Sequence, residues 1–131
     1  MVFFWVYSEK IDSGRVARVA AVLEKRCGLR FSDQDIYVNV AGGIKLSESS
    51  IDAALAAALY SARTDLPLES NVAVFGELSL AGEIRPVSKS KQRIKNSESL
   101  GFTRVLSADD EVVRINTVQE LVKQLFKPAQ K

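Results

Sequence analysis

The stretch between Ser50 and Arg63 constrains the fold of this chain more than any other. Its residues, Ile-Asp-Ala-Ala-Leu-Ala-Ala-Ala-Leu-Tyr-Ser-Ala, form a helical pattern that is apolar nearly all round. A helix of that kind is usually buried in the middle of a fold, because a surface helix keeps one polar face. We therefore expect one compact domain built around this helix, and 131 residues are enough for a single core.

Other helices and strands alternate irregularly around this segment. Asp12 is placed to cap a helix that ends at Gly28, and residues 88–100 form another. Thr117-Val-Gln-Glu120 is a capping-box pattern that opens the last helix. Strand-forming runs occupy residues 1–7, 35–41, 72–78, 83–85 and 103–106. This irregular order favours a mixed α+β architecture over a regular doubly wound sheet.

The chain begins with the apolar run Met1-Val-Phe-Phe-Trp-Val-Tyr7. It is far too short to span a bilayer, and it lacks the basic start and cleavage site of a signal peptide. We interpret residues 1–10 as an atypical apolar strand at the start of a single domain over residues 1–131, with 128–131 as a tail. We expect a cytoplasmic protein without membrane contact.

The chain contains no histidine and a single cysteine, Cys27. Their scarcity excludes Ser-His and Cys-His nucleophile pairs, an internal disulfide, and zinc sites of thiolates or imidazoles. Asp109-Asp110-Glu111 could gather magnesium, but three adjacent carboxylates cannot all face one ion without a special loop. We interpret that run as a solvated turn and expect no metal site.

The segment from Gly42 to Ser50 leads into the apolar helix. It is not a Walker A motif, because no Gly-Lys-Ser/Thr follows at the required spacing, although a glycine pair beside a helix start could cradle an anion. We expect Ser49 or Ser50 to cap the helix by accepting hydrogen bonds from its free N–H groups. The alternative is that Ser50 is a nucleophile or the remnant of one.

The net charge of +2 does not single out a nucleic-acid binder, so an electrostatic argument must be local. The most one-sided run has no acidic residue and consists of Arg85, Lys89, Lys91, Arg93 and Lys95. A phosphate bound at the helix start near Ser88 would meet both the helix N–H groups and these cations. We therefore expect DNA contact here, with a merely solvated face as the alternative.

Several motifs resemble known families. Gly42-Gly43 with Ser50, Gly76-Glu-Leu-Ser-Leu-Ala-Gly-Glu-Ile-Arg-Pro86 and Gly101-Phe102 resemble the proteolytic domain of Lon-type Ser-Lys proteases. Val38-Asn-Val-Ala-Gly-Gly-Ile-Lys45 and Gln92-Arg-Ile-Lys95 resemble more closely the C-terminal Lon-like domain of the bacterial RadA (Sms) family of recombination and repair ATPases. The resemblance covers most of the chain, from about residue 15 to residue 125. It implies a Lon-protease-like fold, related to the second domain of ribosomal protein S5, with a mixed sheet packed with helices. It also implies a ring-forming homo-oligomer, a hexamer in the parent family.

The same resemblance places Ser50 on the Lon nucleophile position and Arg93 on the position of the catalytic lysine. The residues around Ser50 lack the proline and the following glycine of active Lon domains. Arginine cannot act as a general base near neutral pH, because its guanidinium keeps its proton. Lys45 and Lys91 could substitute, but both fit solvated positions. We therefore expect no enzyme activity; the alternative is a Ser-Lys peptidase, or a peptide-binding relic, that uses Ser50.

The expected function is a non-catalytic Lon-like scaffold that oligomerises and contacts DNA, within a RadA-like protein of recombinational DNA repair. The chain has neither a Walker A motif nor a Cys-x-x-Cys zinc pattern. ATP and zinc therefore belong to modules of the family that this chain does not carry, and we expect no cofactor. A pure oligomerisation module is a third possibility.

Overall fold

The computed structural model describes residues 6–9, 12–31, 33–39, 49–109 and 113–126. In these ranges the helices are α1 (Ser13–Cys27), α2 (Asp52–Thr64), α3 (Ser90–Ser99) and α4 (Val118–Leu125), with a 3₁₀ turn at Ser49–Ile51. The strands are β1 (Val6–Glu9), β2 (Ile36–Asn39), β3 (Val72–Val74), β4 (Glu77–Leu78), β5 (Ile84–Arg85), β6 (Arg104–Ser107) and β7 (Val113–Arg114). The predicted mixed α+β class is confirmed.

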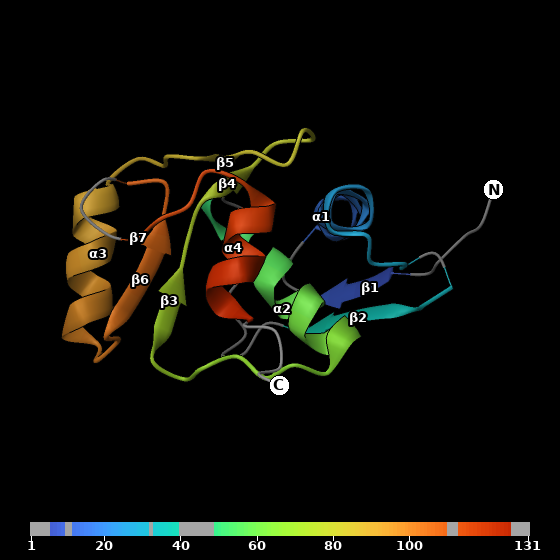
Figure 1. Ribbon diagram of the computed structural model, residues 1–131, viewed down its shortest axis with the longest axis horizontal. Helices are drawn as coiled ribbons and strands as arrows, with labels where there is room; N and C mark the ends of the chain where they lie inside the picture. Colours follow the sequence, from blue (N-terminus) through green and yellow to red (C-terminus); the bar gives the residue numbers. More distant parts are fainter. Residues whose placement is uncertain (1–5, 10–11, 32, 40–48, 110–112, 127–131) are drawn as a thin grey trace.

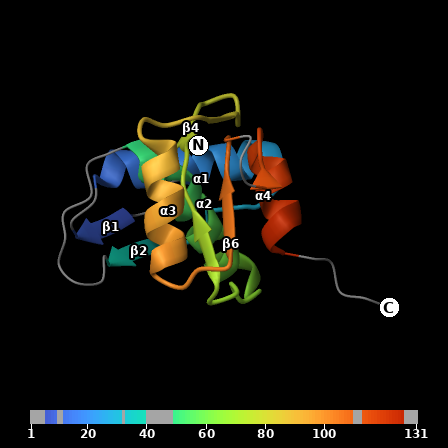
Figure 2. The ribbon, with the colours of Figure 1, turned by 90° about the vertical axis from the view of Figure 1, so that its left-hand side faces the viewer.

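The strands form three separate units. β1 pairs with β2 in parallel, with Val6 opposite Ile36, and β4 pairs with β5 as an antiparallel hairpin. β3, β6 and β7 form a parallel sheet in that order. Figures 1 and 2 show α3 on the outer face of this sheet and α2 and α4 on the opposite side. The hairpin lies beside the start of α4, where the Val118 N–H donates to the Gly82 carbonyl at 2.8 Å (Figure 1).

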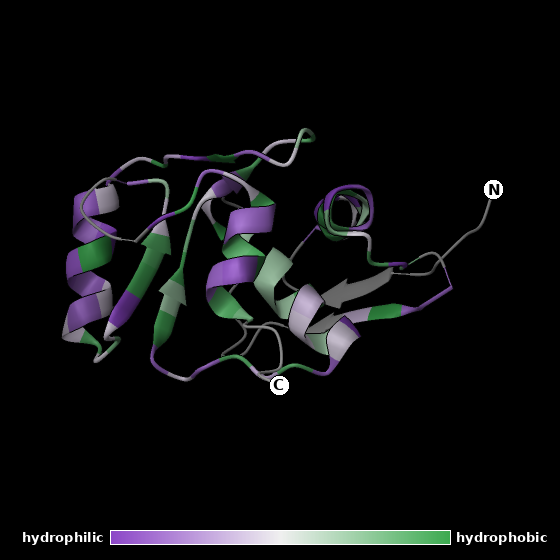
Figure 3. Cartoon of the chain, in the orientation of Figure 1, coloured by the Kyte–Doolittle hydropathy of each residue, from purple (hydrophilic) through white to green (hydrophobic). Residues whose placement is uncertain are grey.

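The two faces of the parallel sheet pack against different groups of residues. Ala73 and Val105 pack with Ile94 of α3 in a small cluster. Val72, Val74 and Leu106 belong instead to the main core. This alternation follows from the two-residue period of a strand. Figure 3 shows α3 as largely hydrophilic, which agrees with a helix that covers the sheet at the surface.

The central position predicted for the apolar helix is confirmed. α2 packs against α1 and α4, and most of its apolar side chains are buried. The helix is not covered on every side, because Ala54, Ala58 and Ala62 are exposed along one stripe. Alanine tolerates this exposure well, because its single methyl group has little apolar area to lose and its helix propensity is the highest.

The predicted caps of α1 and α4 are confirmed. The Asp12 side chain accepts a hydrogen bond from the Gly14 N–H, and Gly28 ends the helix with a left-handed φ of 69°. At α4 the Thr117 hydroxyl accepts from the Glu120 N–H at 3.1 Å. The Glu120 carboxylate accepts from the N–H of Asn116 at 2.8 Å, one residue before the position that a capping box predicts.

The predicted cap of α2 is wrong. Ile51 occupies the N-cap position without a side-chain hydrogen bond, while the Ser49 hydroxyl lies 3.3 Å from Glu77 Oε2. The reason is the 3₁₀ turn, which moves both serines one turn ahead of the helix. Asp52 in the first turn of α2 places its charge near the positive end of the helix dipole.

The strand predicted over residues 72–78 is interrupted at Gly76. Its N–H donates to the Ser50 carbonyl at 2.9 Å, and its carbonyl accepts from the Ala53 N–H at 3.0 Å. These two bonds fasten the chain between β3 and β4 to the start of α2. A Cβ at Gly76 would lie only 2.7 Å from Ile84 Cγ2, so this close approach requires glycine.

Other boundaries differ from the sequence-based ones by a few residues. β1 continues to Glu9, α3 begins at Ser90 rather than Ser88, and β7 was not predicted. Residues 1–5, the glycine pair Gly42-Gly43 and the predicted tail 128–131 lie outside the described residues. In the part of the chain that the structure describes, no helix has the length and apolar character that crossing a membrane requires.

Candidate functional site

Ser50 lies in a pocket between the 3₁₀ turn and the start of α3. Its side chain is largely buried, with a relative exposure of 6%. The pocket, of about 330 Å³, is lined by Ser49, Ser50, Glu77, Pro86, Val87, Ser88 and Arg93. We call it the serine pocket. Because Gly76 holds the Ser50 carbonyl, the backbone of this turn is fixed independently of the serine side chain.

Arg93 reaches the serine pocket from the first turn of α3. It is half-buried, and its Nε donates to the Ser88 carbonyl at 3.0 Å. The fold therefore brings Ser50 and Arg93, which are 43 positions apart in the sequence, to one pocket. Among the described residues, no lysine lines it; Lys45 lies outside them. A guanidinium here can donate hydrogen bonds to an anion, but it cannot take a proton from a hydroxyl.

A second, wider hollow adjoins the serine pocket and shares Ser49 and Glu77 with it. Its volume is about 540 Å³. Its walls come from α1, the start of α2 and the β4–β5 hairpin, and consist of Arg15, Arg18, Ser49, Asp52, Glu77, Leu78, Ser79, Leu80, Ala81 and Arg85. We call this hollow the arginine groove.

A buried ion pair holds the floor of the arginine groove. Arg15 Nη1 lies 2.6 Å from Asp52 Oδ1, and Asp52 is only 1% exposed. The second carboxylate oxygen of Asp52 accepts the Leu78 N–H at 3.1 Å. This one carboxylate therefore joins α1, α2 and β4, and its charge is balanced by Arg15.

Arg18 and Arg85 flank the same groove and are exposed. Neither side chain makes a hydrogen bond or an ion pair with another residue that the structure describes. The sequence analysis singled out Arg85 but missed Arg15 and Arg18, because about seventy positions separate them from it. One signal was available: both lie in the first half of a helix whose first turn has no acidic residue, where the helix dipole disfavours cations.

The cations predicted to contact DNA are divided among three places. Arg85 borders the arginine groove, and Arg93 lies in the serine pocket. Lys91 and Lys95 line a separate hollow of about 410 Å³ on α3, together with Glu98.

Lys89 is exposed and occupies the N-cap of α3 with a φ of 58°, a left-handed conformation that is uncommon for lysine. It lies just before the first turn of α3, not in that turn as the sequence predicted, and Lys91 lies in the first turn.

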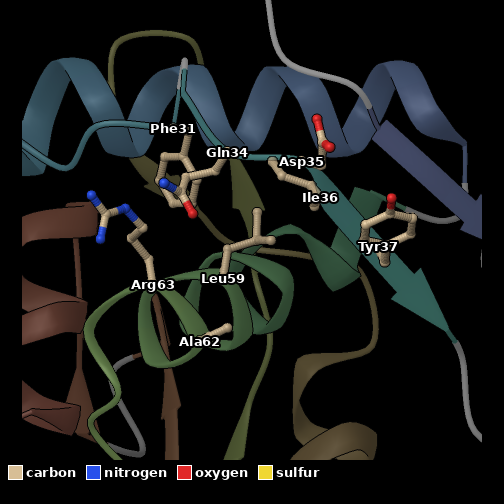
Figure 4. Close-up of a pocket in the computed structure, with 8 residues that line it drawn as sticks. All are labelled: Phe31, Gln34, Asp35, Ile36, Tyr37, Leu59, Ala62 and Arg63. Atoms are coloured by element: carbon tan, nitrogen blue, oxygen red, sulfur yellow. The ribbon is translucent and has the colours of Figure 1, made fainter.

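Figure 4 shows a further pocket that the sequence analysis did not identify. Phe31 and Leu59 extend toward each other across it, and Arg63 lies at its rim. Its volume is about 290 Å³, and Phe31, Ile36 and Leu59 are buried. Arg63 is anchored through Nε to the Arg30 carbonyl at 2.7 Å. The pocket thus combines an apolar floor with a polar rim.

The carboxylate run Asp109-Asp110-Glu111 is only partly described by the structure. Across the described ranges, no group of three or more His, Cys, Asp or Glu side chains could hold a metal ion. Asp110 and Glu111 lie outside those ranges, and Asp109 accepts a hydrogen bond from the Ser90 hydroxyl at 2.5 Å. Burial raises the pKa of the Cys27 thiol above its ordinary value, as expected for a packed cysteine rather than a nucleophile.

The fold and the site define an α+β domain with adjoining polar pockets lined by serine and arginine. Residues 10–111 match the model of the family described as subunit ChlI of Mg-chelatase, and the chain belongs to that family. It is also 62% identical over 100 residues to DNA repair protein RadA of Treponema pallidum, which covers 76% of this chain and 22% of that protein.

Two further relatives bear the same name. DNA repair protein RadA of Brucella abortus is 50% identical over 70% of this chain and 20% of its own length. A Streptococcus pyogenes protein of that name is 42% identical over 88% of this chain and 28% of its own length. The resemblance to RadA is thereby confirmed, and the chain spans less than a third of the length of these relatives. The matched family model is not that of a Lon protease, so the Lon-like fold stays a prediction.

Proposed function

We propose that this chain is a non-catalytic scaffold domain that contacts DNA within a RadA-like protein of recombinational DNA repair. The similarity to proteins named DNA repair protein RadA supports the repair role. The observation that carries DNA contact is the exposure of Lys89, Lys91 and Lys95 around the first two turns of α3.

These three lysines suit a phosphate backbone better than an ordinary helix surface. The first turn of α3 contains no acidic residue, so the positive end of the helix dipole and the lysines add their positive potential at the same place. A phosphate bound there neutralises both. Because each such contact releases counterions, the affinity for DNA falls steeply as salt rises.

We also propose how several copies of the chain assemble around DNA. A Lon-protease-like fold and a ring of six copies would place several α3 surfaces around one DNA molecule, which would raise the avidity without new contacts. The scaffold needs no cofactor of its own in this scheme, and its place is the cytoplasm, where bacterial DNA lies.

Duplex binding tests the lysine surface. We expect the triple variant Lys89→Glu, Lys91→Glu, Lys95→Glu to bind a fluorescently labelled duplex at least tenfold more weakly in anisotropy titrations. A matched variant with Lys25→Glu, Arg30→Glu and Lys123→Glu has the same change in net charge at exposed positions elsewhere. Equal losses in the two variants would show that only the net charge matters, and unchanged binding in the first would refute the surface.

The lack of catalysis rests on Arg93. General-base assistance is typically worth about 10²–10⁴ in rate, and the guanidinium beside Ser50 supplies none. The meeting of Ser50 and Arg93 in one pocket also supports the second candidate, a Ser50-dependent peptidase or peptide-binding relic.

Cleavage of an unfolded protein or a fluorogenic peptide separates these candidates. We expect the wild-type chain and Ser50→Ala to give the same background signal, because neither has a base for the hydroxyl. Turnover that exceeds background and disappears in Ser50→Ala would establish the peptidase and overturn the non-catalytic proposal.

A further inference from the structure

We propose that the arginine groove binds single-stranded DNA, with phosphates at Arg18 and Arg85 and a base against Leu80. This inference rests on the proposed function, since it names a second form of the same ligand. It concerns a different surface, on the hairpin and α1, to which the lysines of α3 do not contribute.

The two polar hollows are continuous with each other. The arginine groove and the serine pocket share Ser49 and Glu77, so their combined floor runs from Arg93 on α3 to Arg18 on α1. Serine side chains line it at intervals, and hydroxyls can donate hydrogen bonds to phosphate oxygens. The shared residues thus make one elongated path of the two hollows.

The charged side chains that line the arginine groove favour an anionic ligand. Asp52 is the most buried acid in the groove, and Arg15 already balances it at 2.6 Å. Glu77 accepts a hydrogen bond from the Ser49 hydroxyl and keeps its charge, so the groove has three guanidinium groups against two carboxylates. The side chains of Arg18 and Arg85 remain exposed, without a hydrogen bond or an ion pair to any other residue in the described ranges. Two guanidinium groups on opposite walls are therefore available for an anion with more than one charge.

An apolar residue, Leu80, lines the groove together with these arginines. Leu80 lies in the turn of the β4–β5 hairpin and is 72% exposed. In a duplex the bases are paired and stacked inside, whereas an unpaired base presents an apolar face that a side chain can cover. The groove therefore offers arginines that can bind phosphates and a leucine that can cover a base. This combination favours a single strand over a duplex.

The decisive measurement is the salt dependence of binding to labelled oligothymidine. For the double variant Arg18→Ala, Arg85→Ala, we expect an affinity at least tenfold lower. We also expect the slope of log K against log salt to become shallower by about 1.4, because each lost phosphate contact in a single strand contributes about 0.7. Leu80→Ala should weaken binding several-fold and leave this slope unchanged.

The control variant is Lys25→Ala, Arg30→Ala, which removes the same charge at exposed positions. Lys25 lies ten residues from Arg15 along α1, about 15 Å at a rise of about 1.5 Å per residue, and neither Lys25 nor Arg30 lines the groove. The control should bind oligothymidine nearly as well as the wild type. Far-UV circular dichroism verifies folding, which the exposure of Arg18 and Arg85 leads us to expect.

The outcomes distinguish this inference from the proposed function. If the wild type binds duplex through α3 but the Arg18, Arg85 variant binds oligothymidine unchanged, only the groove assignment falls. If the wild type binds neither form, the proposed function fails and the inference with it. If the double variant loses binding to polyglutamate but not to oligothymidine, the groove takes an acidic peptide, and the inference is overturned.

Discussion

At the scale of single residues, Asp52 has the most demanding environment. It is almost fully buried, and each carboxylate oxygen has a separate partner, Arg15 Nη1 and the Leu78 N–H. A buried ion pair contributes little net stability over apolar residues of the same size, but removing one partner leaves the other charge without compensation. Asp52 therefore holds α1, α2 and the hairpin in register at the site.

Replacing Asp52 measures this dependence. We expect Asp52→Ala to lower the free energy of unfolding by about 3 kcal/mol, because it leaves both Arg15 and the Leu78 N–H without a partner. Asp52→Asn keeps an acceptor for Leu78, so it should cost less. Urea unfolding followed by circular dichroism gives both values. The exposed control Asp33→Ala should change stability by no more than about 0.5 kcal/mol, and an equally small effect for Asp52→Ala would contradict this role.

At the scale of elements, the break between β3 and β4 decides where Ser50 lies. The two hydrogen bonds that fasten Gly76 to the start of α2 join backbone groups, so they form only where the two segments approach closely. The Ile84 side chain of β5 limits that approach from the other side. The geometry of the serine pocket therefore depends on a glycine outside its lining.

Substitution of Gly76 tests this dependence. Gly76→Ala should lose about 1–3 kcal/mol of stability from the contact with Ile84 alone. The control Gly28→Ala places a Cβ in open space, so it should show only the cost of its left-handed backbone, about 1–2 kcal/mol. Urea unfolding of both variants compares the two costs. A smaller loss at Gly76 than at Gly28 would mean that the hairpin moves aside freely.

The sequence predicted elements well where the signal is local. The caps at Asp12 and Thr117 act within three residues, so their patterns are readable directly. The Ser49–Ser50 cap was wrong because a distant acceptor, Glu77, takes the Ser49 hydroxyl. For the same reason Arg15 and Arg18 were missed. Their closeness to Arg85 arises from the packing of α1 against the hairpin, which no local pattern encodes.

At the scale of the whole molecule, the polar hollows adjoin one another across α1, the 3₁₀ turn and α3. The serine pocket shares Ser49 and Glu77 with the arginine groove, and Arg93 of α3 lines its other end. The pocket shown in Figure 4 lies instead between β2 and α2, and shares no lining residue with them. The proposed DNA contact and the proposed assembly of copies therefore need not use the same surface.

The proposed ring predicts the mass in solution. Light scattering after size-exclusion chromatography should give a mass near six times 14.4 kDa for the full chain, and the same assembly should persist when DNA is added. A mass of one chain that increases only with DNA would mean that DNA organises the copies. A monomer under both conditions would contradict the oligomeric proposal while leaving the lysine surface open to test.

The parallel pairing of β3 with β6 also determines the order in which this chain can fold. β3 finds its neighbour only after the hairpin and α3 have been made, because residues 75–103 form the connection between them. α4, which packs against α2, is later still. During synthesis from the N-terminus, the side of α2 that packs against α4 therefore stays partly uncovered until residues 118–125 have left the ribosome. A nascent chain shortened before Thr117 would expose that side, and it should be a preferred client of chaperones.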